Sequence, residues 1–246
     1  MTVLDTARRS AASATTSFLY RVDGSASWKV GTSHIIVSVS GPIEVNKRDE
    51  LPDVATVEIV VRPDTGVTST REQFLQDRIR KVFATVIVLD LHPRTLIQIV
   101  VQIVQSGDSK MLNTMTLSAS INATYMALLD AGVPVRSTVS ATSIIYYKTQ
   151  ADEVSSWPGG VGVLIDPSRT ELERIEQDIM SVHTVAYELK GGKIERLVLS
   201  ESVGSFTEDQ VLEAYDSAAK ICQSTNETMR EAVINGVQQK SRWRET

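Results

Sequence analysis

The sequence is poor in cysteine and histidine, and these absences limit the kinds of site it can build. One cysteine among 246 residues, Cys222, excludes an internal disulfide framework and suits a reducing compartment. The three histidines, His34, His92 and His183, are far apart in the sequence, and no Cys/His spacing indicates a zinc site. We therefore predict neither a metal ion nor a cofactor, and we assign the histidines structural or surface roles.

Two further absences narrow the class of protein. The longest apolar stretch, around residues 97–104, is interrupted by Gln98 and Gln102 and falls short of the ~18 apolar residues of a membrane span, so no membrane partner is expected. The net charge of −5 does not attract nucleic acid, so RNA contact requires local basic residues or partner chains. No G-x-S-x-G or similar nucleophile element occurs, and no nucleotide-binding loop supports a small-molecule transferase.

Apolar and polar residues alternate along several segments, which predicts β-strands. In the first of two predicted hairpins, residues 17–41, the alternation places Ile35, Val37 and Val39 on one face of a strand. The second predicted hairpin spans residues 178–200. Further strands are predicted at residues 54–63, 95–106, 135–148 and 160–166.

Three segments predict helices. In residues 68–90, apolar side chains recur at helical intervals, and Thr70 and Gln73 have capping-box spacing. A second helix is predicted to begin near residue 113, and a third begins at Thr207 with capping-box spacing to Gln210. The order of these elements indicates an α+β fold, with mixed β-sheets packed against α-helices.

The chain is predicted to form one domain over residues 17–240, because no repeat of fixed period and no low-complexity linker divides it. Residues 1–16 include Arg8 and Arg9 but lack a convincing amphipathic face, which favours a flexible tail over a transit peptide. Residues 241–246 are predicted to form a C-terminal tail.

The stretch NTMTLSASINATYMALLDAGVPV, residues 113–135, predicts a loop that runs into a helix whose first turns are small and hydroxylated. The first N–H groups of a helix lack partners within the helix and the helix dipole favours negative charge, so this start is suited to an anion. Sites of this kind that turn over phosphate usually add an arginine or lysine, and the nearest cation here, Lys110, precedes the helix. The pattern leaves open a phosphate site or the remnant of one.

Asp166 has two interpretations. It follows an apolar predicted strand, which is a common place for a catalytic carboxylate. It also precedes Pro167, where aspartate commonly starts a turn. The residues alone favour the turn, and the catalytic interpretation stays open.

Several segments resemble, in order along the chain, the RNase PH family of phosphorolytic 3′-to-5′ exoribonucleases. They are DGSASWKVGTSHIIVSVSGPIEV, VEIVVRPDTGVTSTRE, PRTLIQIVVQIVQSGDSKMLNTMTLSASINATYMALLDAGVP, and VLIDPSRTE with the later DIMSVHTVAY. The resemblance implies the RNase PH-type fold, which is similar to domain 2 of ribosomal protein S5. It also implies a six-member ring of related chains around a central RNA channel.

The resemblance also places the family's active site on this chain. Active members hold the attacking phosphate with basic and hydroxyl groups, and a carboxylate assists protonation of the leaving oxygen. One phosphate-site arginine falls at Leu117, a second falls at Asp77, and one of two active-site aspartates falls at Leu172, close to Glu171 and Glu173. We interpret the corresponding positions as a vestigial active site without a catalytic residue: Asp77, Thr116, Leu117, Asp166 and Leu172.

These replacements predict that the chain alone has no phosphorolytic activity. A phosphate dianion that attacks an anionic phosphodiester needs fixed cations and N–H donors, and losing one such group costs about 2–4 kcal/mol of transition-state stabilisation. If the positions correspond as the resemblance implies, Leu117→Arg together with Asp77→Arg should restore anion affinity.

The resemblance further implies a core ring subunit of the eukaryotic RNA exosome, which scaffolds ribosomal RNA processing and mRNA turnover in the nucleus, nucleolus and cytoplasm. Its partners would be other RNase PH-like subunits in a hetero-hexameric ring, cap subunits with S1 and KH domains, an associated exoribonuclease and single-stranded RNA. Candidate RNA contacts are Arg62 and Arg71, with Lys47 and Arg48 weaker; each of these is alternatively a solvated charge or an interface ion pair. The alternative function is an active phosphate-dependent exoribonuclease in which Asp166 still works.

Overall fold

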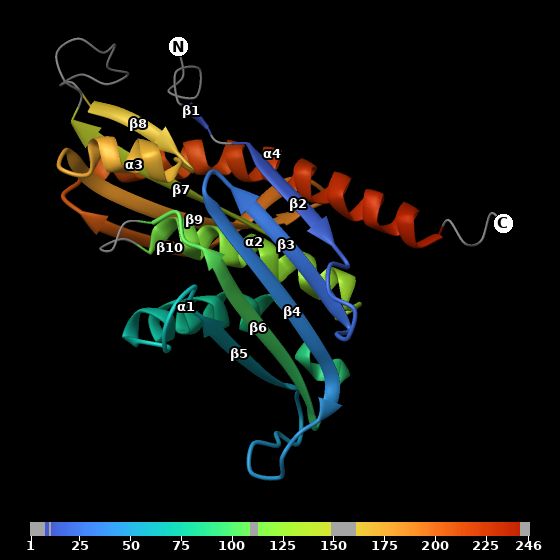
Figure 1. The fold of residues 1–246 in the computed structure, drawn as a ribbon. Coiled ribbons are helices and arrows are strands. Elements are labelled where there is room, and N and C mark those ends of the chain that lie inside the picture. Colours follow the sequence, from blue (N-terminus) through green and yellow to red (C-terminus); the bar gives the residue numbers. More distant parts are fainter. Residues whose placement is uncertain (1–7, 10, 109–112, 149–160, 242–246) are drawn as a thin grey trace.

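The computed structural model describes residues 8–9, 11–108, 113–148 and 161–241, which form two five-stranded sheets and four α-helices (Figure 1). The strands are β1 (Arg8–Arg9), β2 (Ala12–Thr16), β3 (Gly24–Val30), β4 (Ser33–Glu44), β5 (Thr56–Arg62), β6 (Thr95–Gln105), β7 (Thr138–Lys148), β8 (Val161–Ile165), β9 (Ile179–Lys190) and β10 (Lys193–Gly204). The helices are α1 (Thr70–Val86), α2 (Thr114–Asp130), α3 (Arg169–Ile175) and α4 (Glu208–Ser241), with a short 3₁₀ helix at Leu89–Leu91.

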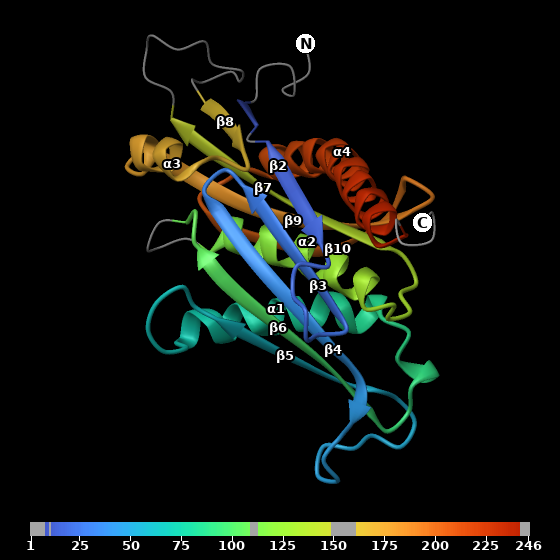
Figure 2. The same cartoon turned by 45° about the vertical axis from the view of Figure 1, so that its right-hand side comes forward.

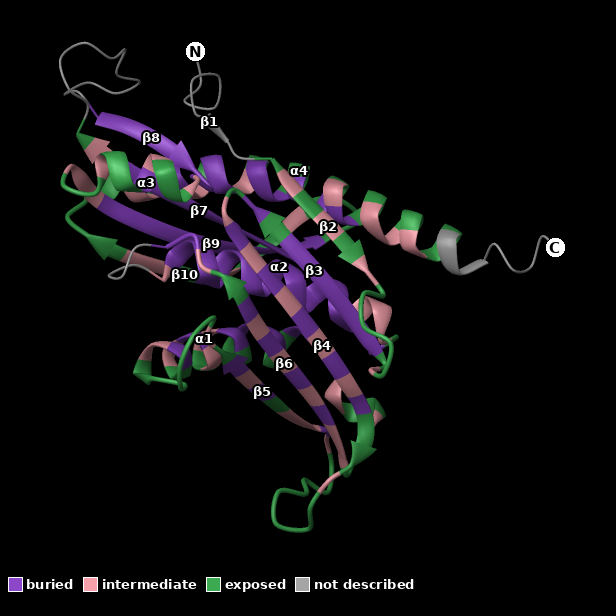
Figure 3. Cartoon of the chain, viewed as in Figure 1, coloured by how far each residue is buried: buried purple, intermediate pink, exposed green. Residues whose placement is uncertain are grey.

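The first sheet has the strand order β2-β3-β4-β6-β5. Its pairings are antiparallel except for β5 with β6, which run parallel. Burial alternates along β4 and β6, as the banding in Figure 3 shows, so that Ile35, Val37 and Ile99 face the core. The predicted inner face of β4 and the strands predicted at residues 54–63 and 95–106 are therefore confirmed. The hairpin predicted over residues 17–41 is β3 and β4, but residues 17–23 form a loop before it and β4 continues to Glu44.

The second sheet has the strand order β1-β8-β7-β9-β10. Strands β7, β8, β9 and β10 pair antiparallel, and β1 adds to β8 in parallel. The predicted hairpin of residues 178–200 is β9 and β10, joined at Gly191 and Gly192, both with positive φ. With the first sheet, this one confirms the predicted α+β fold with mixed sheets.

Helix α2 lies between the two sheets and contacts β3 and β4 on one side and β7 and β9 on the other (Figures 1 and 2). It is buried all round from Thr114 to Leu128, which explains its small residues, because two sheets must approach one helix closely. The close approach is visible at Gly24, where an added Cβ would stand 2.2 Å from the amide nitrogen of Ala131. The Asn122 side chain fixes α2 to β7 by bonding both the N–H and the carbonyl of Ala141, each at 2.8 Å.

The remaining helices cover the outside of this assembly. Helix α1 packs on β5 and α2, and α4 packs along β7, β9 and β2. Thr207 and Gln210 form the predicted capping contacts at the start of α4, with Gln210 Oε1 accepting from the Thr207 amide at 2.9 Å. At α1 the capping box is one residue earlier than predicted, because Ser69 and Glu72 form it.

Three expectations about the chain's organisation need correction. Residues 8–9 and 12–16 were predicted to lie in a flexible tail, but they pair as β1 and β2, and Thr16 approaches Gly236 of α4. No helix was expected at α3, because its seven residues are too few to display a helical repeat, although Ser168 and Glu171 have capping-box spacing. Helix α4 continues to Ser241, the first residue of the predicted C-terminal tail. Residues 1–7, 10 and 242–246, which make up the rest of the two predicted tails, are outside the described residues.

Candidate functional site

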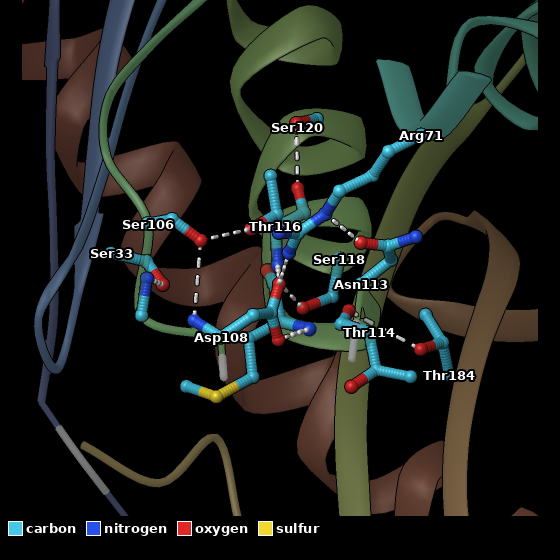
Figure 4. A network of polar contacts seen from close by, with 12 residues as sticks. Ser33, Arg71, Ser106, Asp108, Asn113, Thr114, Thr116, Ser118, Ser120 and Thr184 are labelled. Carbon is cyan, nitrogen blue, oxygen red and sulfur yellow. Dashed lines mark hydrogen bonds and ion pairs between the residues drawn. The ribbon is translucent and has the colours of Figure 1, made fainter. Parts of the chain in front are cut away.

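The start of α2 is an anion site that the chain fills with its own carboxylate (Figure 4). Asp108, from the loop after β6, accepts hydrogen bonds from the amide of Met115 at 3.0 Å and from the amide of Thr116 at 2.8 Å. These are the second and third residues of the helix, whose amides a capping side chain normally satisfies. Asn113, the N-cap residue itself, makes no side-chain cap bond.

Arg71 lies beside the Asp108 carboxylate. Its Nη2 is 4.0 Å from Asp108 Oδ2, and its Nε donates to the side-chain oxygen of Asn113. The Asp108 side chain has no exposed surface, whereas a third of the Arg71 side chain is exposed. Burial raises the pKa of the Asp108 carboxyl above its ordinary value, and the bonds from Thr116 and Met115 and the charge of Arg71 oppose that shift.

The side chains of the two predicted phosphate-motif residues diverge. The hydroxyl of Thr116 stays at the helix start, 3.2 Å from the hydroxyl of Ser106. Both residues are 1% exposed, but Leu117 belongs to the hydrophobic core between the first sheet and α2. The place of Leu117 in that core argues against the expectation that Leu117→Arg restores anion affinity, because a guanidinium there would have to leave the core or be buried in it.

Asp166 is a buried carboxylate whose bonds hold a strand end. Its Oδ1 accepts from the amide and the hydroxyl of Ser143 at 2.9 and 3.1 Å, and its Oδ2 accepts from Thr142 at 3.1 Å. Its backbone has φ = +44°, a left-handed conformation that aspartate tolerates in turns. The turn interpretation of Asp166 therefore agrees with the structure, and these bonds give its carboxylate a structural role.

The other predicted positions of the vestigial site are spread over several environments. Leu172 is buried on α3, in a small apolar cluster with Met115. Of its acidic neighbours, Glu171 caps α3 through Ser168, and Glu173 pairs with Arg169 at 2.9 Å. Asp77 is exposed on α1. Only Leu172 thus lies near the helix start, and it brings no carboxylate there.

Little space remains at the helix start for a ligand. A cavity of about 30 Å³ lies between Arg71, Ser106 and Thr116, room for one or two waters at most. A larger hollow of about 540 Å³ lies at the far end of α1, where Arg136 pairs with Asp90 at 3.6 Å. The Glu188 carboxylate that lines this hollow accepts from Ser137 and Arg196.

The four candidate RNA contacts fall in two places. Arg62 ends β5 and is exposed, and Arg71 begins α1 at the same end of the molecule but is committed to Asp108. Lys47 and Arg48 are exposed in the loop between β4 and β5, at the other end of β5 (Figure 1). The structure therefore does not gather the four residues into one basic patch.

Sequence reasoning did not identify Asp108, the residue that decides the state of this site. Asn113 stands directly before the helix and is a favoured N-cap type, but its side chain makes no cap bond. The available signal was Asp108 itself, an acidic residue five positions before Asn113, where an unusually polar helix begins. Lys110, considered there as the nearest cation, lies outside the described residues.

Comparison with known proteins identifies the family of this chain. Residues 9–134 match the family model of the 3′ exoribonuclease family, domain 1. The chain belongs to the RNase PH family. The resemblance drawn from the four segments is thereby confirmed, and so is the RNase PH-type fold.

Similar proteins extend over most of the chain. Exosome complex component RRP46 of Saccharomyces cerevisiae is 35% identical over 222 residues, which cover 89% of this chain and 93% of that protein. Exosome complex component Rrp41 of Archaeoglobus fulgidus is 28% identical over 228 residues, covering 89% and 80%. The crystal structure of rice (Oryza sativa) Rrp46 has the same fold, with a TM-score of 0.72 at 24% identity over 91% of this chain and 94% of that one.

Across the described ranges, no three His, Cys, Asp or Glu side chains come together in a way that would hold a metal ion. None of the helices in the same ranges combines the length and the apolar character needed to cross a membrane.

Proposed function

We propose that this RNase PH-family chain is a non-catalytic subunit of the core ring of an RNA exosome, of the Rrp46 type. The similarity to exosome components named RRP46 over nearly nine-tenths of the chain supports the ring assignment. The observation that carries the non-catalytic assignment is the Asp108 carboxylate, which occupies the amides of Met115 and Thr116. The subunit would scaffold ribosomal RNA processing and mRNA turnover and line the RNA channel.

The chemistry of phosphorolysis explains why this carboxylate matters. An attacking phosphate needs N–H donors and cations aimed at its oxygens, in a place that it can reach. Here the two amides are already bonded to the carboxyl oxygens of Asp108, and Arg71 lies beside the same carboxyl group. A phosphate in that position would meet electrostatic repulsion from Asp108 and would have to displace it.

A ring subunit of this kind works through its surfaces. We propose as partners the other RNase PH-like subunits of a hetero-hexameric ring, S1 and KH cap subunits, an associated exoribonuclease and single-stranded RNA. Arg62 is the most accessible candidate for RNA contact, because Arg71 is engaged with Asp108. We expect the protein in nucleus, nucleolus and cytoplasm, which imaging of a fluorescent fusion checks.

Two assays test the proposal. The purified chain, incubated with inorganic phosphate and single-stranded RNA, should release no nucleoside diphosphates. Co-expressed with the RNase PH-like exosome subunits of its own organism, it should elute with them as one complex at the mass of a ring. Release of nucleoside diphosphates would instead favour the active exoribonuclease, and elution alone would remove the exosome assignment.

A further inference from the structure

The hollow of about 540 Å³ at the C-terminal end of α1 is bordered by that helix end, by the 3₁₀ helix and by the hairpin of β9 and β10. We call it the α1 hollow. Its lining shares no residue with the small cavity at the start of α2. Its volume lies within the range of about 300–1,000 Å³ that is usual for binding pockets. The α1 hollow is therefore large enough for a ligand and separate from the vestigial site.

The floor of the α1 hollow is apolar. Val54, Ile87 and Leu89 line it, and Ile87 is only 1% exposed. Backbone contacts fix this floor, because the amide of Arg136 donates to the carbonyl of Val86 at 2.9 Å. An aliphatic side chain of a ligand would thus rest on a surface that is already in place, which lowers the cost of binding.

The rim of the α1 hollow carries two ion pairs. On the hairpin side, the Glu188 carboxylate accepts from Ser137 and Arg196. Burial tends to raise the pKa of the Glu188 carboxyl, but these bonds and the nearby positive charges outweigh burial and lower it, so the group is ionised at neutral pH. On the other side, Arg136 pairs with Asp90 at 3.6 Å. More than half of each arginine side chain is exposed, so both guanidinium groups keep donors for a ligand.

Two further charges face the α1 hollow without an ion pair. A β-bulge between Ile194 and Arg196 makes Glu195 the extra residue of β10, and bulges commonly redirect a side chain beside a functional site. Lys190 ends β9 opposite it, and both side chains line the hollow and are exposed. In the described part of the chain, neither comes within ion-pair distance of an opposite charge. The hollow thus offers one acidic and one basic group to a ligand.

The balance of charge selects the kind of occupant. The lining holds three acidic and three basic residues: Asp90, Glu188, Glu195, Arg136, Lys190 and Arg196. Single-stranded RNA needs an excess of cations and aromatic side chains, and this lining has neither. Permanent subunit interfaces are mostly apolar, with little charge at their centre, whereas a polar, partly exposed surface is typical of partners that bind and leave. An extended peptide presents apolar and charged side chains in turn, which matches an apolar floor under a charged rim.

We propose that the α1 hollow binds an extended peptide segment of a protein that associates reversibly with this chain. The segment places an aliphatic side chain on the floor, an acidic side chain against Lys190 and a basic side chain against Glu195. The inference rests on the proposed function only in one respect, because that function supplies the permanent subunits from which this partner is distinguished.

Peptide selection combined with an exchange of charges tests the proposal. A phage-displayed library of random peptides is selected on the purified chain, and the affinity of the selected peptides is measured by fluorescence anisotropy. The variant Lys190→Glu with Glu195→Lys reverses the two charges of the α1 hollow and keeps the net charge. The control exchange, Lys220→Glu with Glu227→Lys, makes the same change on the exposed side of α4.

Selection on the wild-type chain should enrich peptides that carry an aliphatic residue between an acidic and a basic residue. The charge exchange in the α1 hollow should weaken these peptides by about tenfold or more, and selection on that variant should return the two charges in reverse order. The control exchange should leave the affinity unchanged. A selection that enriches no such peptides, or peptides whose affinity ignores the exchange in the hollow, would overturn the proposal.

The same peptides are then measured on the chain co-expressed with the RNase PH-like exosome subunits of its own organism. Equal affinity in the complex supports a reversible partner. Loss of affinity in the complex would mean that a permanent subunit covers the α1 hollow and would overturn that assignment. Failure of the chain to join the complex would remove the proposed function, while the selections on the purified chain would still decide whether the hollow binds a peptide.

Discussion

The start of α2 and the outer face of the first sheet have similar residues in opposite surroundings. The outer face consists of the outward side chains of β4, β6 and β5 around Ser38 and Val100. Both are rich in small hydroxylated side chains. At the helix start, polar groups form hydrogen bonds within the chain. Asp108 accepts from the amides of the first turn, and the hydroxyls of Ser118 and Ser120 donate to carbonyls of the preceding turn. On the outer face, Ser38 lies beside Val100 and Val60, all half-buried, and no helix in the described part of the chain covers them.

This difference indicates which part of the molecule is available to a ligand or a partner. In an active enzyme we expect the unsatisfied groups to lie in the catalytic pocket, ready for the substrate. Here the chain itself satisfies the amides of Met115 and Thr116, and the sheet face that no helix covers in the described part of the chain lies on the outside. This distribution fits a protein whose task is assembly.

Of the substitutions considered, Leu117→Arg should cause the largest loss in the free energy of unfolding. The guanidinium would enter the core between the first sheet and α2, and we expect a loss of more than about 4 kcal/mol in the free energy of unfolding, or no folding at all. Urea denaturation followed by circular dichroism measures this, with Gln73→Arg at an exposed position of α1 as the control. A stable Leu117→Arg protein that binds phosphate would instead show that position 117 faces the phosphate site, as the family resemblance implies.

Removing the internal anion should have the next largest effect. Asp108→Ala leaves two buried amides without their acceptor and removes the ion pair with Arg71, and we expect a cost of about 2 kcal/mol in the free energy of unfolding. Thr207→Ala removes an ordinary cap of α4 and should cost about 1 kcal/mol in the same denaturation experiment. Equal costs would mean that Asp108 is no more than a helix cap.

His183 lies in the interior and His34 on the outer face of the first sheet, so their titrations can be compared. Burial lowers the pKa of His183 to about 4, between Tyr146 and Phe206, so the folded chain keeps it neutral while the unfolded chain is protonated below about pH 6.5. Folding stability should therefore fall by about 1.4 kcal/mol per pH unit as the pH drops from 6.5 towards 4.

The half-buried His34, on the outer side of β4, should contribute less. Its pKa is lowered by burial and by the charge of Lys29. Denaturation of His183→Gln and His34→Gln between pH 7.5 and 5 measures both contributions, and His183→Gln should flatten the dependence more. A steeper dependence in His183→Gln than in the wild type would contradict the buried neutral imidazole.

The two arginines at the same end of the molecule should give the smallest effects. Arg71→Ala removes the partner of Asp108 and should cost about 1 kcal/mol in the free energy of unfolding. Arg62→Ala changes an exposed side chain and should stay within about 0.5 kcal/mol. Chemical denaturation of both variants checks this order, and a larger loss in Arg62→Ala would show that Arg62 has a structural contact.

Much of the fold could be predicted from the sequence, because period-two alternation records burial directly. Ile35 and Val37 mark the inner side of β4, and the capping spacing of Thr207 and Gln210 marks the start of α4. The tail was predicted wrongly because residues 12–16 carry little apolar signal; they are ordered by pairing with β3 and by contact with α4.

The candidate site was predicted less well than the fold. The family resemblance located the helix start, but the direction of a side chain is set by helix phase, which turned Leu117 into the hydrophobic core and the equally buried Thr116 towards Ser106. Asp108 reaches the helix start from a loop, and such contacts depend on tertiary structure that no local pattern records.

Titration of inorganic phosphate into the wild-type chain and into Asp108→Ala, followed by calorimetry, tests the central claim most directly. The account predicts no saturable binding to the wild type, and binding to Asp108→Ala that is lost when Arg71 is also changed to alanine. Saturable phosphate binding to the wild-type chain that Arg71→Ala abolishes would contradict it.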